Sequence, residues 1–217
     1  MDQTAKRLAH YFLEGNFDDA LHTVREHQAN YASLEVFSSL LTPAMKYIGE
    51  LWENSEITVA DEHLATAVCD MVISHLYQQL STSQNERQKA MFFCLEGEEH
   101  YLGLKMVNRL FEEDGWDTKY FGSNLPLEYA VKTAAEWKPQ VIGLSVSIAY
   151  HLPKLKAYVK ELESLSCKPR VIVGGRMAEK YDLRPYCSEN TVIIHNIQAI
   201  ADWLRQYQLG DKANAIS

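Results

Sequence analysis

The sequence lacks any concentration of positive charge. Lysine and arginine number 21 against 29 aspartates and glutamates in 217 residues, and the formal net charge is −8. A protein that binds a phosphate backbone needs a cluster of basic side chains to displace the counterions, and no such cluster is present. Direct binding to nucleic acid is therefore not expected.

Cysteine and long apolar runs are also scarce. The four cysteines are Cys69, Cys94, Cys167 and Cys187, with no C-x-x-C pair and no secretory apolar region at the N-terminus. This pattern predicts reduced thiols in the cytoplasm. No apolar stretch approaches the roughly 20 residues that a membrane span requires, so the protein is predicted to be soluble and without a membrane partner.

The chain changes character near its middle, which predicts two domains. Residues 1–82 read as amphipathic helix, residues 83–89 form a polar linker, and residues 90–217 alternate short apolar runs with helical patterns. In the first part, short polar breaks separate four predicted helices, a spacing typical of a four-helix bundle. They cover residues 3–13, 17–27, 33–52 and 59–80.

One end of the predicted bundle gathers residues that could line a ligand site. The third helix carries an apolar stripe that ends at Trp52 and that Pro43 is expected to kink without ending. The fourth opens with a capping box, Thr58 to Asp61, followed by Glu62 and His63. A short connection makes the two helices antiparallel, so Trp52, Glu62 and His63 share one end. By themselves, these residues favour a plainer interpretation, the last core residue of a stripe and a solvated first turn.

The second part predicts a Rossmann-like (flavodoxin-like) α/β domain with a five-stranded parallel sheet. Helical patterns separate the strands. The expected strands are 90–95, 117–121, 141–145, 170–173 and 192–195, and the expected helices are 101–113, 127–137, 152–164, a short one after residue 175, and 197–209. Ligands in such sheets bind outside the carboxyl ends of the strands.

A candidate metal-ligating residue follows the first strand. His100 can offer a neutral imidazole nitrogen to a metal, and Glu98 can accept a hydrogen bond from its other nitrogen. Gly103 leaves room where the loop enters its helix. A structural zinc site would need further cysteine or histidine ligands. His100 could instead be an ordinary residue at the start of a helix.

Small residues follow two further strands at the same edge. Ser145 and Ser147 lie at the end of the third strand, and Gly174 and Gly175 follow the fourth. Small hydroxyl side chains leave room for a ligand and can hydrogen-bond to it, while paired glycines let the backbone approach a bulky ligand closely. The glycines could equally form a plain strand-to-helix turn. The residues alone thus indicate a single-histidine metal or cofactor site at the edge of the sheet.

Taken together, Glu98-x-His100-x-x-Gly103, Ser145-x-Ser147 and Gly174-Gly175 resemble the three-part motif of the cobalamin-binding Rossmann-like family. The gaps agree as well, with 41 residues between Gly103 and Ser145 and 26 between Ser147 and Gly174. The resemblance implies that His100 is the lower ligand of cobalt, with Glu98 behind it, and that the serine and glycine loops line a groove for the detached nucleotide tail. The family often has aspartate at the position of Glu98 and leucine at that of Ser147.

The N-terminal half has its own resemblance. Trp52 followed by Glu62-His63 is similar to the Trp-x9-Glu-His signature in the cap of cobalamin-dependent light-sensing repressors. This resemblance implies that the tryptophan and glutamate hold the upper adenosyl group, and that His63 takes the vacated cobalt position after photolysis. The helix-turn-helix domain of those repressors is not expected here, because the first 30 residues are too few and too acidic.

The resulting hypothesis is a stand-alone sensory protein, a cobalamin-dependent light sensor and not an enzyme. Adenosylcobalamin is the favoured cofactor, with methyl- or hydroxocobalamin and a second chromophore such as a bilin left open. Its output would be a change in self-association, as a homo-oligomer, or in binding to a separate effector protein. The alternative is a corrinoid methyl carrier of a methyltransferase system. Two other histidines lie near strand ends: His151 is expected at the corrin periphery, and His195 as a structural helix-entry residue.

Overall fold

The computed structural model describes residues 2–76 and 87–214, with side chains as far as Tyr207. The chain forms two compact units, Met1–Thr82 and Ser83–Ser217. Residues 83–86 of the predicted linker lie outside the described residues, as do residues 77–80 of the fourth predicted helix. The first strand begins inside the predicted linker, at Lys89.

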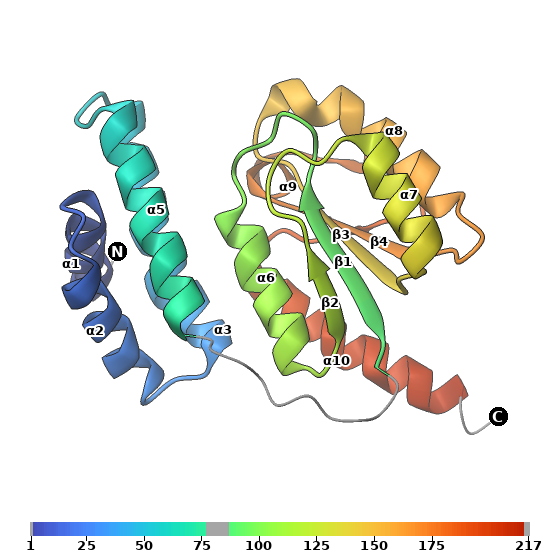
Figure 1. Ribbon diagram of the computed structural model, residues 1–217, viewed down its shortest axis with the longest axis horizontal. Helices are drawn as coiled ribbons and strands as arrows, with labels where there is room; N and C mark the ends of the chain where they lie inside the picture. The colour runs from blue at the N-terminus through green and yellow to red at the C-terminus, as the bar shows by residue number, and fades with distance from the viewer. Residues whose placement is uncertain (1, 77–86, 215–217) are drawn as a thin grey trace. The chain divides into compact units, whose positions relative to one another are not determined.

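The N-terminal unit is helical (Figure 1). Its elements are α1 (Gln3–Leu13), α2 (Phe17–Gln28), α3 (Ser33–Glu35), the π-helix η1 (Val36–Leu41), α4 (Thr42–Glu53) and α5 (Val59–Leu76). The third predicted helix is thus one continuous run through α3, η1 and α4. The π-helix ends at Leu41, two residues before Pro43. Its wider winding gives room to a proline ring that would otherwise meet the carbonyl four residues back. The expectation that Pro43 does not end this helix is confirmed.

The apolar stripe of this helix is buried in its middle and open at its end. Phe37, Leu41 and Ile48 are fully buried, whereas Trp52 is 48% exposed. Trp52 is therefore not the last core residue of its stripe, which removes the simpler of its two interpretations. The predicted capping box of α5 is present: the Thr58 amide donates to Asp61 at 2.8 Å, and the Asp61 amide donates to the Thr58 hydroxyl at 3.3 Å.

The second unit is the predicted five-stranded parallel sheet with helices on both faces. Figure 1 shows α6 and α10 on one side of the sheet and α7 and α8 on the other. The strands are β1 (Lys89–Cys94), β2 (Asp117–Tyr120), β3 (Val141–Ser145), β4 (Arg170–Gly174) and β5 (Val192–Ile193). The helices are α6 (Leu102–Glu113), α7 (Leu127–Trp137), η2 (Ala149–His151), α8 (Leu152–Glu163), α9 (Arg176–Lys180), η3 (Arg184–Tyr186) and α10 (Ile197–Asn214).

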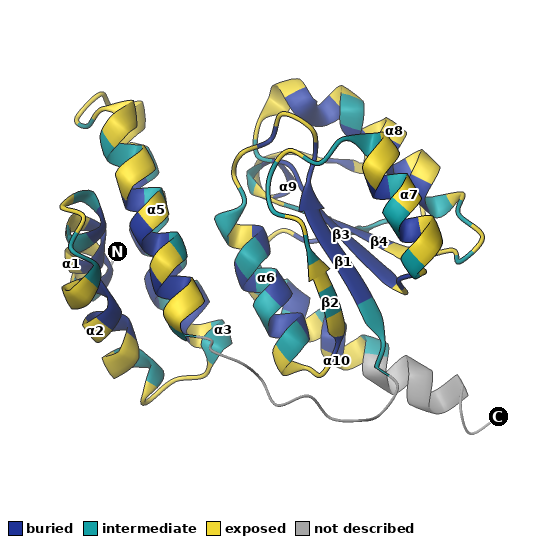
Figure 2. Cartoon of the chain, viewed as in Figure 1, coloured by how far each residue is buried: buried dark blue, intermediate teal, exposed yellow. Residues whose placement is uncertain are grey.

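The strand order places the three sequence motifs side by side. The strand order is β2-β1-β3-β4-β5. Successive strands are therefore added on one side of β1 and then on the other, and the order switches between β1 and β3. Cys94 at the end of β1 pairs with Ser145 at the end of β3, and Ser145 pairs with Gly174 at the end of β4. Figure 2 shows these central strands buried, whereas the edge strand β2 is more open. The loops after β1, β3 and β4 therefore meet at the switch point, where ligands of such sheets bind.

Within the described residues, no helix combines the length and apolar character needed to cross a membrane.

Candidate functional site

The site is built around a buried carboxylate, Glu98, in the loop after β1. Its side chain is fully buried. One carboxylate oxygen, Oε1, accepts hydrogen bonds from Nδ1 of His100 at 2.6 Å and from the His100 amide at 3.1 Å. The hydrogen bond that the sequence predicted between Glu98 and His100 is therefore direct, despite the longer glutamate side chain.

The other oxygen of Glu98 is held by the loop after β3. Oε2 accepts from the Ser147 amide at 2.7 Å, the Ile148 amide at 3.1 Å and Nδ1 of His151 at 3.2 Å. One carboxylate thus joins the loops of two neighbouring strands. The sequence analysis missed these contacts, because they depend on how closely the two loops approach.

These donors keep Glu98 ionised. Burial alone would raise its pKa, but the His100 imidazole, the Ser147 and His100 amides and the His151 imidazole together lower the pKa from 4.5 to about 2. An ionised carboxylate only accepts hydrogen bonds, so Nδ1 of each contacting imidazole must carry the proton. The site therefore holds a negative charge behind two donor rings.

His100 has the arrangement of a metal-ligating histidine. With its proton fixed on Nδ1, the lone pair is on Nε2, which has no hydrogen-bond partner among the described residues. The side chain is 40% exposed, so Nε2 can be reached from outside. The carboxylate behind the ring raises the basicity of the ligating nitrogen. In the part of the chain that the structure describes, no three acidic, histidine or cysteine side chains gather as around a structural metal ion.

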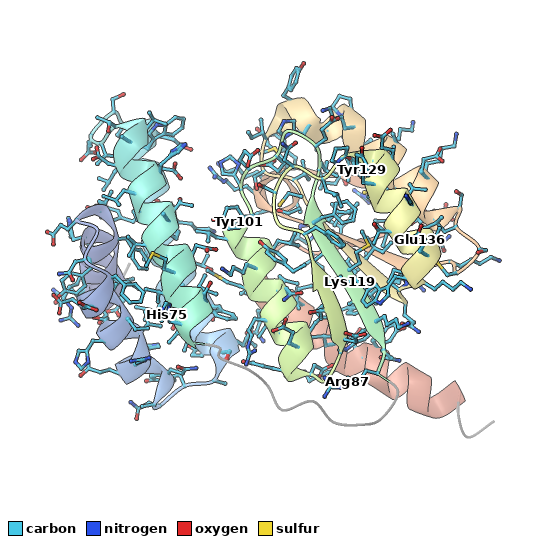
Figure 3. The ribbon with its side chains drawn as sticks, viewed as in Figure 1. His75, Arg87, Tyr101, Lys119, Tyr129 and Glu136 are labelled. Carbon is cyan, nitrogen blue, oxygen red and sulfur yellow. The ribbon has the colours of Figure 1, made fainter. Side chains whose placement is uncertain are left out.

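Contacts with neighbouring elements hold the loop that carries Glu98 and His100. Gly97 adopts φ +86°, and its amide donates to Oδ1 of Asn124 at 2.8 Å. The buried hydroxyl of Tyr158 in α8 donates to the Leu125 carbonyl at 2.7 Å and accepts from the Glu96 amide at 3.2 Å. Figure 3 shows Tyr101, the residue after His100, at the point where the loop enters α6. These contacts within the protein therefore hold the loop in shape.

The serine and glycine motifs differ in what the protein itself requires of them. Gly175 has φ +98°, and a Cβ there would lie 2.5 Å from the Val146 carbonyl and 2.9 Å from the buried Ser145 hydroxyl. A Cβ on Gly174 would make only an ordinary contact at 3.7 Å. The turn alone thus explains Gly175, whereas packing does not explain Gly174. Ser147 is half-buried, with its amide bound to Glu98.

Gly103 marks open space beside His100. It is exposed at the start of α6, and a Cβ there would meet nothing within 4 Å. Neither backbone conformation nor packing demands glycine at this position. The space is suited to a bulky ligand that passes close to the backbone, so the residues present fit a large planar cofactor above His100.

The helical unit holds a second carboxylate–imidazole pair. Nδ1 of His63 lies 3.0 Å from Oε2 of Glu62, whose other oxygen accepts from the Thr66 hydroxyl at 3.0 Å. The His63 side chain is 76% exposed. Trp52 lies one residue before the end of the preceding helix, α4, which joins α5 through residues 54–58. The structure places the three predicted residues at one end of this unit, where each has solvent-accessible surface.

The fold and the site define a class of protein: an α/β domain that presents one imidazole, backed by a buried carboxylate, at the switch point of its sheet, with a helical unit before it. Two family models, both described as the B12 binding domain, match residues 4–77 and 88–186. The chain belongs to this cobalamin-binding family. The cofactor class predicted from the sequence is thereby confirmed.

Known relatives agree with this membership. The chain is 27% identical over 174 residues to the HTH-type transcriptional repressor CarH of Myxococcus xanthus, covering 79% of this chain and 56% of the repressor. It is 24% identical over 120 residues to monomethylamine corrinoid protein 1 of Methanosarcina acetivorans, covering 54% of this chain and 55% of that protein. The chain thus spans about half the length of each relative.

A solved structure has the same fold. The monomethylamine corrinoid protein of Methanosarcina barkeri superposes with a TM-score of 0.72 at 18% identity, over 92% of this chain and 96% of that one. The predicted architecture, a helical N-terminal part followed by a five-stranded Rossmann-like domain, is therefore confirmed.

Proposed function

We propose that Nε2 of His100 is the lower ligand of the cobalt in a bound cobalamin. The observation that carries this proposal is the buried Glu98 carboxylate, which fixes the proton of His100 on Nδ1 and leaves Nε2 open at the sheet edge. The bound cofactor would supply a cobalt–carbon bond that can be broken and re-formed. The protein would supply the fixed ring, the charge behind it and a loop held by its own contacts.

The nucleotide tail would follow the small residues beside His100. We assign Ser145, Ser147, Gly174 and Gly175 to this groove, and Gly103 to its entrance. The free space at Gly103 and Gly174 supports this assignment, because the protein's own packing would allow a side chain at both positions.

In the loaded protein, Trp52, Glu62 and His63 would contact the upper ligand. Exposure of Trp52 and the hydrogen bond between His63 and Glu62 support this role. With Nδ1 of His63 held by the carboxylate, its Nε2 is available to take the upper cobalt position after the alkyl group has left.

We infer that the protein is a sensor and not an enzyme, with adenosylcobalamin as the favoured cofactor and light as the signal. The similarity to a transcriptional repressor across both domains supports a regulatory role. The output would be a change in self-association or in binding to an effector protein. The four cysteines are all free thiols, which suits a cytoplasmic protein.

The alternative is a corrinoid methyl carrier that serves separate methyltransferase subunits. It is favoured by one observation: a sequence match at 20% identity extends over 85% of dimethylamine corrinoid protein 1 of Methanosarcina acetivorans, whereas the chain covers only 56% of the repressor. A carrier would use His100 in the same way, but it must expose its methyl group to partner enzymes.

The test loads the protein with adenosylcobalamin in the dark, removes unbound cofactor, and records absorption and size-exclusion profiles before and after green light. His100→Ala is compared with His22→Ala, a control on the exposed face of α2. The sensor proposal predicts retention, a light-dependent spectral change and a new elution position, with His100→Ala alone defective. Retention without any change of assembly or partner binding under light would favour the carrier.

The lower ligand has a direct spectroscopic test. Protein labelled with 15N-histidine is loaded with cob(II)alamin, and the electron paramagnetic resonance spectrum is recorded. Coordination by His100 changes the superhyperfine splitting on labelling, whereas coordination by the cofactor's own benzimidazole leaves it unchanged. An unchanged spectrum would contradict the role of His100.

A further inference from the structure

The sheet has an open edge at β2. This strand is the last in the strand order, so it pairs with β1 on one side only. The amides of Asp117 and Phe121 each donate to a carbonyl on the β1 side at 2.8 Å, so these two residues face β1. Successive residues of a strand direct their backbone groups to opposite edges. The N–H and C=O of Thr118 therefore point away from β1 and can pair with one more strand.

Two opposite charges lie two residues apart on this strand. Asp117 and Lys119 are both exposed, whereas Thr118 between them is half-buried. Alternation along a strand puts the two charged side chains on one face of the sheet. This is the face covered by α7, because Nζ of Lys119 lies 4.7 Å from the ring centroid of Trp137 (Figure 3). In the part of the chain that the structure describes, Asp117 forms no ion pair.

The α/β unit holds β2 from both faces. On one face, the Thr118 hydroxyl donates to Glu112 of α6 at 3.1 Å. On the other, Lys119 lies over the ring of Trp137 at the end of α7. A strand that its own unit already holds loses little conformational freedom when a further strand pairs with it. The edge is therefore suited to binding another strand.

The two charges select the strand that can pair with this edge. A lysine on an edge strand discourages pairing with other chains. Here an aspartate two residues earlier supplies the opposite charge, so a second copy of β2 carries the complement of both. Two copies related by a twofold axis pair antiparallel, and the twofold closes the assembly at two chains. A strand of unrelated sequence would match Asp117 and Lys119 only by chance.

One register satisfies both charges at once. With Thr118 opposite Thr118 of the second copy, each Asp117 lies directly opposite a Lys119, which gives two ion pairs. Moving the centre to position 117 or 119 places like charges opposite each other, and moving it to position 120 places Lys119 opposite Phe121. In the favoured register the outward groups of the two Thr118 residues bond to each other. The charged pairs then occupy the closer, non-hydrogen-bonded positions.

We propose that the edge of β2 is a homodimer interface, in which two copies of the strand pair antiparallel about Thr118. The two five-stranded sheets become one continuous sheet, and Asp117 and Lys119 set its register. Neither charged side chain belongs to the site around His100. The dimer therefore forms without cobalamin, and the inference goes beyond the proposed function.

Charge exchange tests the register. Sedimentation velocity of the cofactor-free protein is recorded over a concentration series for wild type, Lys119→Asp, Asp117→Lys and the double variant that exchanges the two residues. Each single variant places like charges opposite each other twice, so we expect dimerisation to weaken by about 10-fold or more. The double variant restores both pairs and should dimerise as wild type does. The matched control is Lys156→Asp, which makes the same charge change on the exposed face of α8 and should have no effect.

The backbone pairing has a separate test. Proline is tolerated on an edge strand where the N–H faces outward, so Thr118→Pro removes the outward donor and keeps the pairing with β1. Thr118→Val keeps the donor, and both variants lose the hydroxyl bond to Glu112. Only Thr118→Pro should be monomeric. In wild type, deuterium exchange of the Thr118 amide should slow as the protein concentration rises.

Several outcomes would overturn the proposal. Wild type that stays monomeric throughout the series would mean that Lys119 only keeps other strands away. Dimers that tolerate the single charge reversals, or a double variant that stays monomeric, would exclude the register. Amide exchange covers the case in which the variants do not fold, because unchanged exchange of Thr118 in a wild-type dimer would place the interface elsewhere. Failure to retain cobalamin would refute the proposed function and leave these results standing.

Discussion

Replacing Glu98 by glutamine is the most informative perturbation, because the substitution keeps the shape of the side chain and removes its charge. The carboxylate accepts five hydrogen bonds, two at Oε1 and three at Oε2. An amide has one oxygen, so its NH2 group must face either the donors from His100 or those from the β3 loop. At least one backbone amide then loses its acceptor: that of His100 in one orientation, and those of Ser147 and Ile148 in the other.

Two estimates of the cost agree. A donor left without its acceptor costs about 1–3 kcal/mol. Independently, lowering the pKa of Glu98 from 4.5 to about 2 corresponds to about 3 kcal/mol of stability at neutral pH. We therefore expect Glu98→Gln to lower the free energy of unfolding of the α/β unit by about 3 kcal/mol.

The pH dependence follows from the direction of the shift. Because the folded-state pKa is depressed, the contribution of the carboxylate is complete above pH 4.5 and is lost as the pH falls toward about 2. Wild type should lose this stability across that window, while Glu98→Gln has no carboxylate to protonate there. The difference between the two proteins should therefore narrow in acid.

The assay is urea unfolding of the cofactor-free protein, followed by tryptophan fluorescence in a Trp52→Phe background. This background removes the tryptophan of the helical unit, so the signal comes from the α/β unit, where Trp116 is 3% exposed. A difference well below 1 kcal/mol at neutral pH, or one that stays constant between pH 5 and 2.5, would refute the reasoning about the buried carboxylate.

The remaining predictions concern glycines and a helix cap. Gly175→Ala should destabilise the α/β unit by about 1–3 kcal/mol in thermal unfolding, because φ is +98° and the Cβ would clash with the Val146 carbonyl. Gly103→Ala should leave the melting temperature of the cofactor-free protein nearly unchanged but weaken cobalamin binding in a titration. A lower melting temperature with normal binding would contradict the role of Gly103. Thr58→Ala should cost about 1 kcal/mol, because the capping hydrogen bond to the Asp61 amide is lost. This loss should be seen in helical circular dichroism without a change in the lower-ligand spectrum.

Periodicity and turn chemistry determined most of the fold. The buried strands β1, β3 and β4 are continuous apolar runs, and the capping box at Thr58 marks the start of α5, so these elements follow from local sequence. Parallel connection then places the loops with His100, Ser145 and Gly174 on one edge, because successive strands of this kind end on the same side. The Glu98–His100 hydrogen bond was also predictable, because the two residues are only two positions apart in the sequence.

Only the tertiary structure decided the rest. Pattern alone placed Trp52 at the end of a buried stripe with no way to tell its exposure, which depends on what packs beside it. The contact of His151 with Glu98 joins residues 53 positions apart, and it depends on the separation and conformation of two loops. Likewise, packing requires glycine at position 175, where a Cβ would clash with a carbonyl, but not at position 103, where a Cβ would contact nothing. The sequence determined which chemical groups reach the sheet edge. Three-dimensional packing determined which of them share a carboxylate, because contacts between distant residues are not visible in the periodicity of the sequence.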